Sequence, residues 1–123
     1  MTMVYRGLIV AMVLLFVVMG AGFWLDPTVA GARIGLEAMN PTGANALPGD
    51  FGGLFIGMAV LLLLGLWRPA AAWLPAVAVL LGTIAVGRII GFTQSPMSDD
   101  ALLALMVEVV SVAILLLAHR RLS

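Results

Sequence analysis

Two oppositely charged residues, Arg88 and Glu108, lie inside long apolar stretches and are the strongest candidates for chemistry. A charge within a membrane span costs about 2.5–3.5 kcal/mol on insertion scales, so such residues normally face the protein interior and pair. An arginine suits an anionic or carbonyl-bearing ligand, and a glutamate at this depth can carry a proton. We expect either a direct ion pair that fixes the packing of two helices or a polar pocket that opens toward the outer membrane face.

Three further polar residues are candidates to join this polar cluster. Ser111 lies one helical turn after Glu108 on the same face, and Thr83 lies on the helix that carries Arg88. Asp50 lies at the outer tip of the preceding apolar stretch. The two hydroxyl groups can add hydrogen bonds, and Asp50 or Glu108 can serve as a general acid or base. The predicted polar cluster therefore comprises Arg88, Glu108, Asp50, Ser111 and Thr83.

Other kinds of site have little support in the composition. The chain has no cysteine, which excludes disulfides, thiol catalysis and thiolate metal sites. Its one histidine, His119, is expected to be a solvated cap at the end of the last helix. We predict no metal site, and no cofactor is evident. All six basic residues are arginines, and the absence of lysine argues against a polybasic patch for nucleic acid or anionic lipid.

Four apolar stretches must position the polar cluster. Hydrophobic residues make up 63% of the 123 residues and charged residues only 10%, against about 25% in an ordinary soluble domain. The stretches predict helices over residues 5–25, 51–67, 70–91 and 99–119, because about 20 residues of helix cross a hydrocarbon core of about 30 Å. The first is too long for a signal peptide and lacks a clean cleavage site, so we expect it to be retained. The sequence predicts an all-α protein, a four-transmembrane-helix bundle forming a single integral membrane domain over residues 1–123.

Charges outside the spans predict the orientation. One side of a four-span topology holds arginines and no acid: Arg6, Arg68, Arg120 and Arg121. The other side holds the acids together with Arg33: Asp26, Glu37, Asp50, Asp99 and Asp100. The positive-inside rule then places both termini in the cytoplasm, and we expect a bacterial inner membrane. Aromatic residues are expected to form belts at the two interfaces, with Tyr5, Trp67 and Trp73 inside and Phe23, Trp24, Phe51 and Phe92 outside.

The outer loop, residues 26–50, is long for so small a protein. It opens with Asp26-Pro27, a typical N-cap followed by proline at the first helical position. We predict a short amphipathic helix on the outer membrane face, ended by Asn40-Pro41, with Arg33 and Glu37 paired along it. Residues 42–49 are expected to be irregular. Ser98 is predicted to cap the fourth helix.

The glycines suggest how two of the helices pack. Gly53, Gly57 and Gly65 lie along the second span, and Gly82, Gly87 and Gly91 along the third. Small residues at four-residue spacing allow helix backbones to approach closely in lipid. We expect them to pack the second and third helices against each other, with a dimer contact as the alternative.

A series of short motifs resembles a known family. The series consists of Asn45, the segment 49–53 (Gly-Asp-Phe-Gly-Gly), Gly87-Arg88, Ser95-Pro96 and Glu108. It resembles a bacterial family of four-helix membrane proteins catalogued as a domain of unknown function. It is more distantly similar to the DoxX-like proteins, some of which are subunits of quinone-linked oxidoreductases. The family pattern has an arginine and a tyrosine where this chain has Pro48 and Phe51, so a site built on those two side chains is not carried over.

These observations leave three functional classes open. The leading hypothesis is a small integral membrane subunit or accessory protein that packs against a larger membrane complex, or binds lipid or quinone. The alternatives are a small proton-coupled transporter and a membrane enzyme, such as an isomerase, that uses Arg88 and Glu108. The expected partners are membrane lipid and either a larger membrane protein complex or further copies of the chain, with no nucleic acid.

Overall fold

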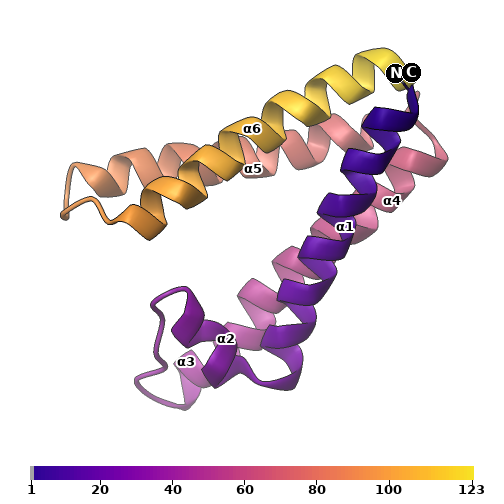
Figure 1. The fold of residues 1–123 in the computed structure, drawn as a ribbon. Helices are drawn as coiled ribbons and strands as arrows, with labels where there is room; N and C mark the ends of the chain where they lie inside the picture. Colours follow the sequence, from indigo (N-terminus) through magenta and orange to yellow (C-terminus); the bar gives the residue numbers. More distant parts are fainter. Residues whose placement is uncertain (1) are drawn as a thin grey trace. The chain divides into compact units, whose positions relative to one another are not determined.

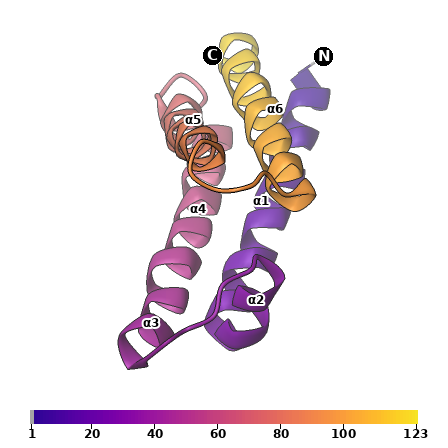
Figure 2. The same ribbon diagram turned by 90° about the vertical axis from the view of Figure 1, so that its left-hand side faces the viewer.

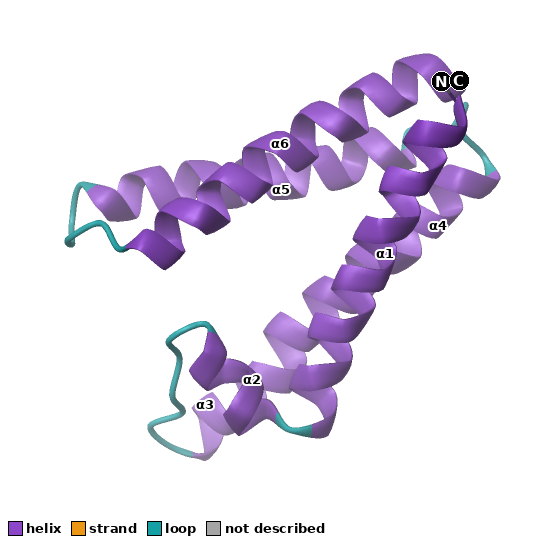
Figure 3. Cartoon of the chain, in the orientation of Figure 1, coloured by secondary structure: helices purple, strands orange, loops and turns teal. Residues whose placement is uncertain are grey.

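The described chain is entirely helical apart from its connections. A computed structural model describes residues 2–123, which contain no strand (Figures 1 and 3). The long helices are α1 (Thr2–Leu25), α4 (Gly53–Trp67), α5 (Trp73–Phe92) and α6 (Asp99–Leu122). Four helical segments are long and apolar enough to cross a membrane. They are α1, α5, α6 and the continuous helical segment Pro41–Trp67, which contains α4. The all-α class with four membrane-spanning helices is confirmed.

The chain forms two compact units. The first unit is Ile9–Leu63, and the second unit combines the residues up to Leu8 with Leu64–Ser123. In the first unit, the buried side of α1 places Ile9, Met12, Val13, Phe16, Gly20 and Phe23 on one helical stripe. The stripe packs against α4, where Met58, Ala59 and Leu62 are buried. Phe23 stacks on Phe51 and Phe55 with ring centroids 5.6 and 6.0 Å apart. Phe23 is only 2% exposed, so its predicted place in an interfacial belt is wrong: the ring fills the space between two helices.

The short helix predicted after Asp26 is present as α2 (Pro27–Arg33). The Asp26 carboxylate accepts a hydrogen bond from the Val29 amide at 3.4 Å, which confirms the N-cap. The helix ends earlier than predicted because Gly35 has φ +78°, and the Leu36 amide donates to the Gly31 carbonyl at 2.8 Å. Glu37 therefore lies beyond the helix, and the predicted pair with Arg33 is not formed.

The second span begins ten residues earlier than predicted. Helix α3 (Pro41–Ala46) continues through a π-helical turn, η1 (Leu47–Gly52), directly into α4, so residues 42–49 are helical rather than irregular. Asn40 does not stop a helix: its side-chain oxygen accepts from the Gly43 amide at 2.9 Å and begins one. The physical reason is the same as at Asp26-Pro27, because a proline at the first helical position sacrifices no hydrogen bond.

This N-cap gives a first testable prediction. Asn40→Ala is expected to weaken α3 by about 1 kcal/mol, the usual cost of losing an N-cap side chain. The Gly43 amide donates its hydrogen bond to the Asn40 side chain, so hydrogen exchange at this amide should accelerate by roughly five-fold in the variant. Asn45→Ala, a change of the same residue type at an exposed position in α3, is the matched control and should leave that rate unchanged. Equal acceleration in both variants would contradict the cap.

The second unit is built on an antiparallel hairpin of α5 and α6 (Figure 1). Leu74, Val77, Ala78, Leu81 and Ala85 form the buried stripe of α5, and Leu115 and Ala118 are buried on α6. The predicted cap of α6 is confirmed, since the Ala101 amide donates to the Ser98 hydroxyl at 3.1 Å. At the opposite end of the hairpin, Arg6 at the start of α1 donates to the Leu66 carbonyl of α4 at 3.4 Å.

Candidate functional site

Arg88 and Glu108 continue the packing seam between α5 and α6. Arg88 follows Ala85 on the buried stripe of α5, and Glu108 precedes Leu115 by seven residues on the buried stripe of α6. Helical side chains lean toward the N-terminus of their own helix. Because the two helices are antiparallel, Glu108 leans toward the connecting loop and Arg88 leans away from it. This opposite tilt brings together two residues whose backbones lie at different depths.

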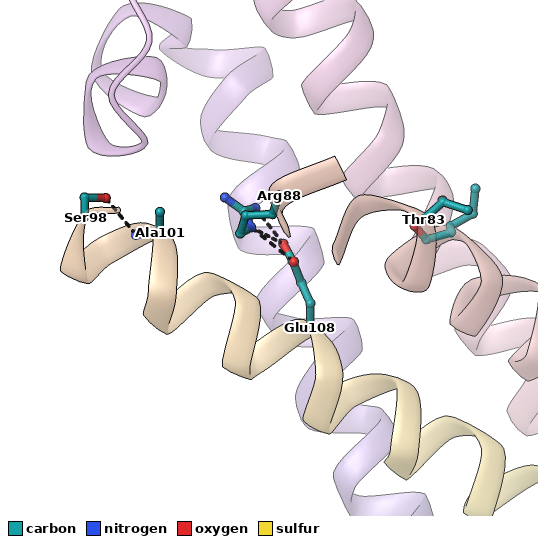
Figure 4. A network of polar contacts seen from close by, with 6 residues as sticks. Thr83, Arg88, Ser98, Ala101 and Glu108 are labelled. Carbon is teal, nitrogen blue, oxygen red and sulfur yellow. Dashed lines mark hydrogen bonds and ion pairs between the residues drawn. The ribbon is translucent and has the colours of Figure 1, made fainter. Parts of the chain in front are cut away.

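The two side chains form a direct, two-pronged ion pair (Figure 4). Arg88 NH2 lies 2.6 Å from Glu108 Oε1, and Arg88 Nε donates to both carboxylate oxygens at 3.2 Å. The side chain of Arg88 is 31% exposed and that of Glu108 is 12% exposed. Charge-assisted bonds of this kind are among the strongest in proteins, and the planar guanidinium fixes the direction of approach. Of the two alternatives, a direct pair and an open pocket, the geometry supports the pair.

Two of the other predicted members, Thr83 and Ser111, make no hydrogen bond to the pair. The Thr83 hydroxyl donates to the Leu80 carbonyl of its own helix at 2.8 Å and is exposed (Figure 4). Ser111 lies on the α6 seam but makes no hydrogen bond to the pair. Asp50 lies in η1, in the other unit, and its membership of the cluster stays a prediction. Within residues 2–123, Arg88–Glu108 is the one ion pair, and no three potential metal-binding side chains lie together.

The glycines that pack closely are mostly not those expected from spacing. Of the predicted set, only Gly65 meets a neighbour: a Cβ there would lie 2.7 Å from Leu74 Cγ. Around the remaining five, nothing in the same unit beyond the adjacent residues and the nearby backbone of the helix lies within 4 Å of such a Cβ: Gly53, Gly57, Gly82, Gly87 and Gly91. Whether these five bring helices together stays a prediction. Gly20 was missed, although a Cβ there would lie 2.6 Å from Ile56 Cδ1.

Trp24 makes a second missed contact, within the first unit. Its indole N–H donates to the Pro48 carbonyl in η1 at 3.0 Å. A Cβ on Gly52 would lie 2.5 Å from Trp24 Cδ1, so only glycine allows the ring to lie there. The neighbouring Phe51 stacks on Phe23. These contacts give the segment 49–53 a structural role in joining η1 to the end of α1.

His119 is not the solvated cap that was predicted. Its side chain is half-buried, and its Nδ1 atom is buried without a hydrogen-bond partner in the described chain. The reason is its register, because His119 follows Leu115 by one turn and so lies beside the packed side of α6.

The fold and the ion pair together define a class: a multi-pass, all-helical membrane protein whose spans contain a paired arginine and glutamate. The chain belongs to the family described as a domain of unknown function, DUF4345, whose model matches residues 4–119. The resemblance drawn from the short motifs to a family of this description is thereby confirmed. No curated protein and no solved structure matches the chain.

Proposed function

We propose that the protein is a small integral membrane subunit or accessory protein that packs against a larger membrane complex through its helix faces. In this proposal it lies in a bacterial inner membrane with both termini in the cytoplasm. The arginines Arg6, Arg68, Arg120 and Arg121 support that orientation through the positive-inside rule. Binding of lipid or quinone along the same faces is compatible with this role.

The observation that carries the proposal is the closed geometry of the Arg88–Glu108 pair. A proton carrier or general acid needs a carboxylate that can meet its proton donor or substrate. Both oxygens of Glu108 are instead engaged by the Arg88 guanidinium, and the carboxylate side chain is 12% exposed. This arrangement is typical of a contact that fixes helix packing. It supports the accessory role over the transporter and the enzyme.

The surface of the chain also supports a binding role. Large apolar side chains on α1 and α6 are exposed, among them Leu14 and Val18 on α1 and Leu103 on α6, each about 60% exposed or more. Lipid or the helices of a partner can cover such faces equally well.

A mild-detergent pull-down of the tagged protein from its native membrane tests the proposal. We expect one larger membrane protein to be recovered in a fixed ratio, identified by mass spectrometry and a native gel. The untagged strain provides the background. Val18→Trp and Leu103→Trp enlarge exposed positions on two helices, and at least one should release the partner while the protein stays folded. Recovery of the protein alone, or as a homo-oligomer, overturns the accessory role.

A further inference from the structure

The second unit gathers four arginines at one end, here called the arginine end. Arg68 lies in the turn before α5, and Arg120 and Arg121 lie in the last turn of α6, which runs antiparallel to α5. Arg6 reaches the same end, because it donates to the Leu66 carbonyl two residues before Arg68. In Figures 1 and 2 the start of α1 and the end of α6 lie at the same end of the unit.

No acidic side chain lies close to the arginine end along α6. The nearest acid along α6 is Glu108, twelve residues before Arg120, which is about 18 Å along the helix, and it is already paired with Arg88. In the described chain none of the four arginines forms an ion pair. The exposed guanidiniums can therefore attract an anion.

A hollow at this end provides a place for that anion. Arg120, Arg121 and Leu117 line a space of about 340 Å³. The space is an open depression on the surface of one helix. The two guanidiniums can donate paired hydrogen bonds to phosphate oxygens. Leu117, which is 46% exposed, offers an apolar surface one helical turn before Arg121. A polar head beside an apolar wall matches a phospholipid, in which a phosphodiester joins the acyl chains.

Two exposed tryptophans near the arginine end support a position for the hollow at the level of the lipid headgroups. Trp67 is 71% exposed, and the Arg68 guanidinium lies 4.9 Å from the centre of its ring. Trp73, at the start of α5, is also exposed. Tryptophan is enriched at the boundary between hydrocarbon and water. Arginines on this boundary meet lipid phosphates.

We propose that the arginine end binds an anionic phospholipid, with its phosphodiester held by Arg120 and Arg121 and the start of an acyl chain lying against Leu117. This differs from the expectation based on the lack of lysine. No run along the chain is longer than two arginines, and the folded chain brings the arginines together from three segments. The proposal requires only that this end lies at a membrane surface, so it does not depend on a partner complex.

Native mass spectrometry of the detergent-solubilised full chain tests this proposal. The protein is mixed with equal amounts of dioleoyl phosphatidylglycerol and dioleoyl phosphatidylcholine, and the bound lipids are counted. We expect a preference for phosphatidylglycerol that falls about five-fold in Arg121→Gln and about 30-fold in Arg120→Gln/Arg121→Gln, from about 1 kcal/mol per arginine near the surface. Helical circular dichroism checks that these exposed changes leave the fold intact.

Two control arms decide the source and the place of binding. Arg33→Gln removes an exposed arginine at the end of α2, in the other unit, and should leave the lipid preference unchanged. Excess inorganic phosphate should displace little phosphatidylglycerol if the acyl chain contributes. An unchanged preference in the double variant, an equal loss in Arg33→Gln, or full displacement by inorganic phosphate would each overturn the proposal. Loss of a partner complex in the pull-down would leave it standing.

Discussion

Replacing Arg88 by methionine is expected to lower the free energy of unfolding by roughly 3–5 kcal/mol, because it leaves the Glu108 carboxylate unpaired on the α5–α6 seam. Glu108 is 12% exposed and lies nine residues after the start of α6, about 13 Å along the helix, which is too far for its short side chain to reach the end of the span. Replacing the other partner, in Glu108→Leu, should lower the free energy of unfolding by less. The Arg88 side chain is 31% exposed and long enough to turn toward the headgroups. Unfolding in mixed detergent micelles, followed by helical circular dichroism, gives both values.

The double variant Arg88→Met/Glu108→Leu separates the ion pair from its two charges. Replacing a whole pair by apolar side chains of similar volume is often neutral or stabilising, so the double variant should recover most of the stability. Arg33→Met, at an exposed arginine without an ion pair in the described chain, should change stability by no more than about 0.5 kcal/mol. A double variant as unstable as the sum of its two single variants would show that the residues are not coupled.

The pair and the spans could be predicted because strong forces act on them. Lipid leaves helices as the only structure for a long apolar stretch, and a charge within such a helix must find a partner. These constraints predict α1, α5 and α6 and make Arg88 and Glu108 candidates for a pair, but they leave a polar pocket open as the alternative; the structure shows the direct pair. They do not fix the hydroxyl contacts. Thr83 has a carbonyl acceptor within its own helix, which satisfies it without reaching the pair.

The start of the second span could not be predicted from hydropathy. Residues 41–50 contain threonine, asparagine, proline, aspartate and two glycines, and this composition resembles a loop. Local capping determines where the second span begins. Asn40 begins α3, and the helix continues past Pro48 through the π-helical turn η1. Asn40-Pro41 has the same pattern as Asp26-Pro27. A proline after a capping residue marks a beginning in both places.

Glycine spacing alone does not identify the glycines at which helices pack most closely. A four-residue repeat says that a helix has a small-residue face, but it does not say which face meets a neighbour. The partners at Gly20 and Gly52 are large side chains from the facing helix, Ile56 and Trp24. Their fit depends on the register between α1 and α4, which the sequence of either helix alone does not contain. The adjacent glycines Gly52 and Gly53 therefore differ sharply: Gly52 lies against Trp24, whereas nothing packs closely on Gly53.

Gly52→Ala is expected to destabilise the first unit, and Gly53→Ala is its matched control one residue away. A Cβ at Gly52 would lie 2.5 and 2.6 Å from Cδ1 and Nε1 of Trp24, and 3.3 Å from the Cβ of Phe23. The rigid indole must move to make room, which endangers its hydrogen bond to the Pro48 carbonyl. Overpacking of this kind costs about 1–3 kcal/mol. Nothing in the unit beyond the adjacent residues and the nearby backbone of the helix lies within 4 Å of a Cβ at Gly53, so alanine there should stabilise the helix by about 0.5–1 kcal/mol.

The two alanine variants should thus shift stability in opposite directions, although they make the same chemical change in the same stretch of helix. Thermal unfolding gives the sign, and Trp24 fluorescence in the Trp67→Phe/Trp73→Phe background reports the indole directly. In Gly52→Ala the emission should change as the ring leaves its place over η1, whereas in Gly53→Ala it should not. Unfolding and emission that are the same in both variants would mean that Trp24 does not hold η1 to α1. A cost that appears only at Gly52 would show that this glycine is needed for the close approach of the Trp24 ring.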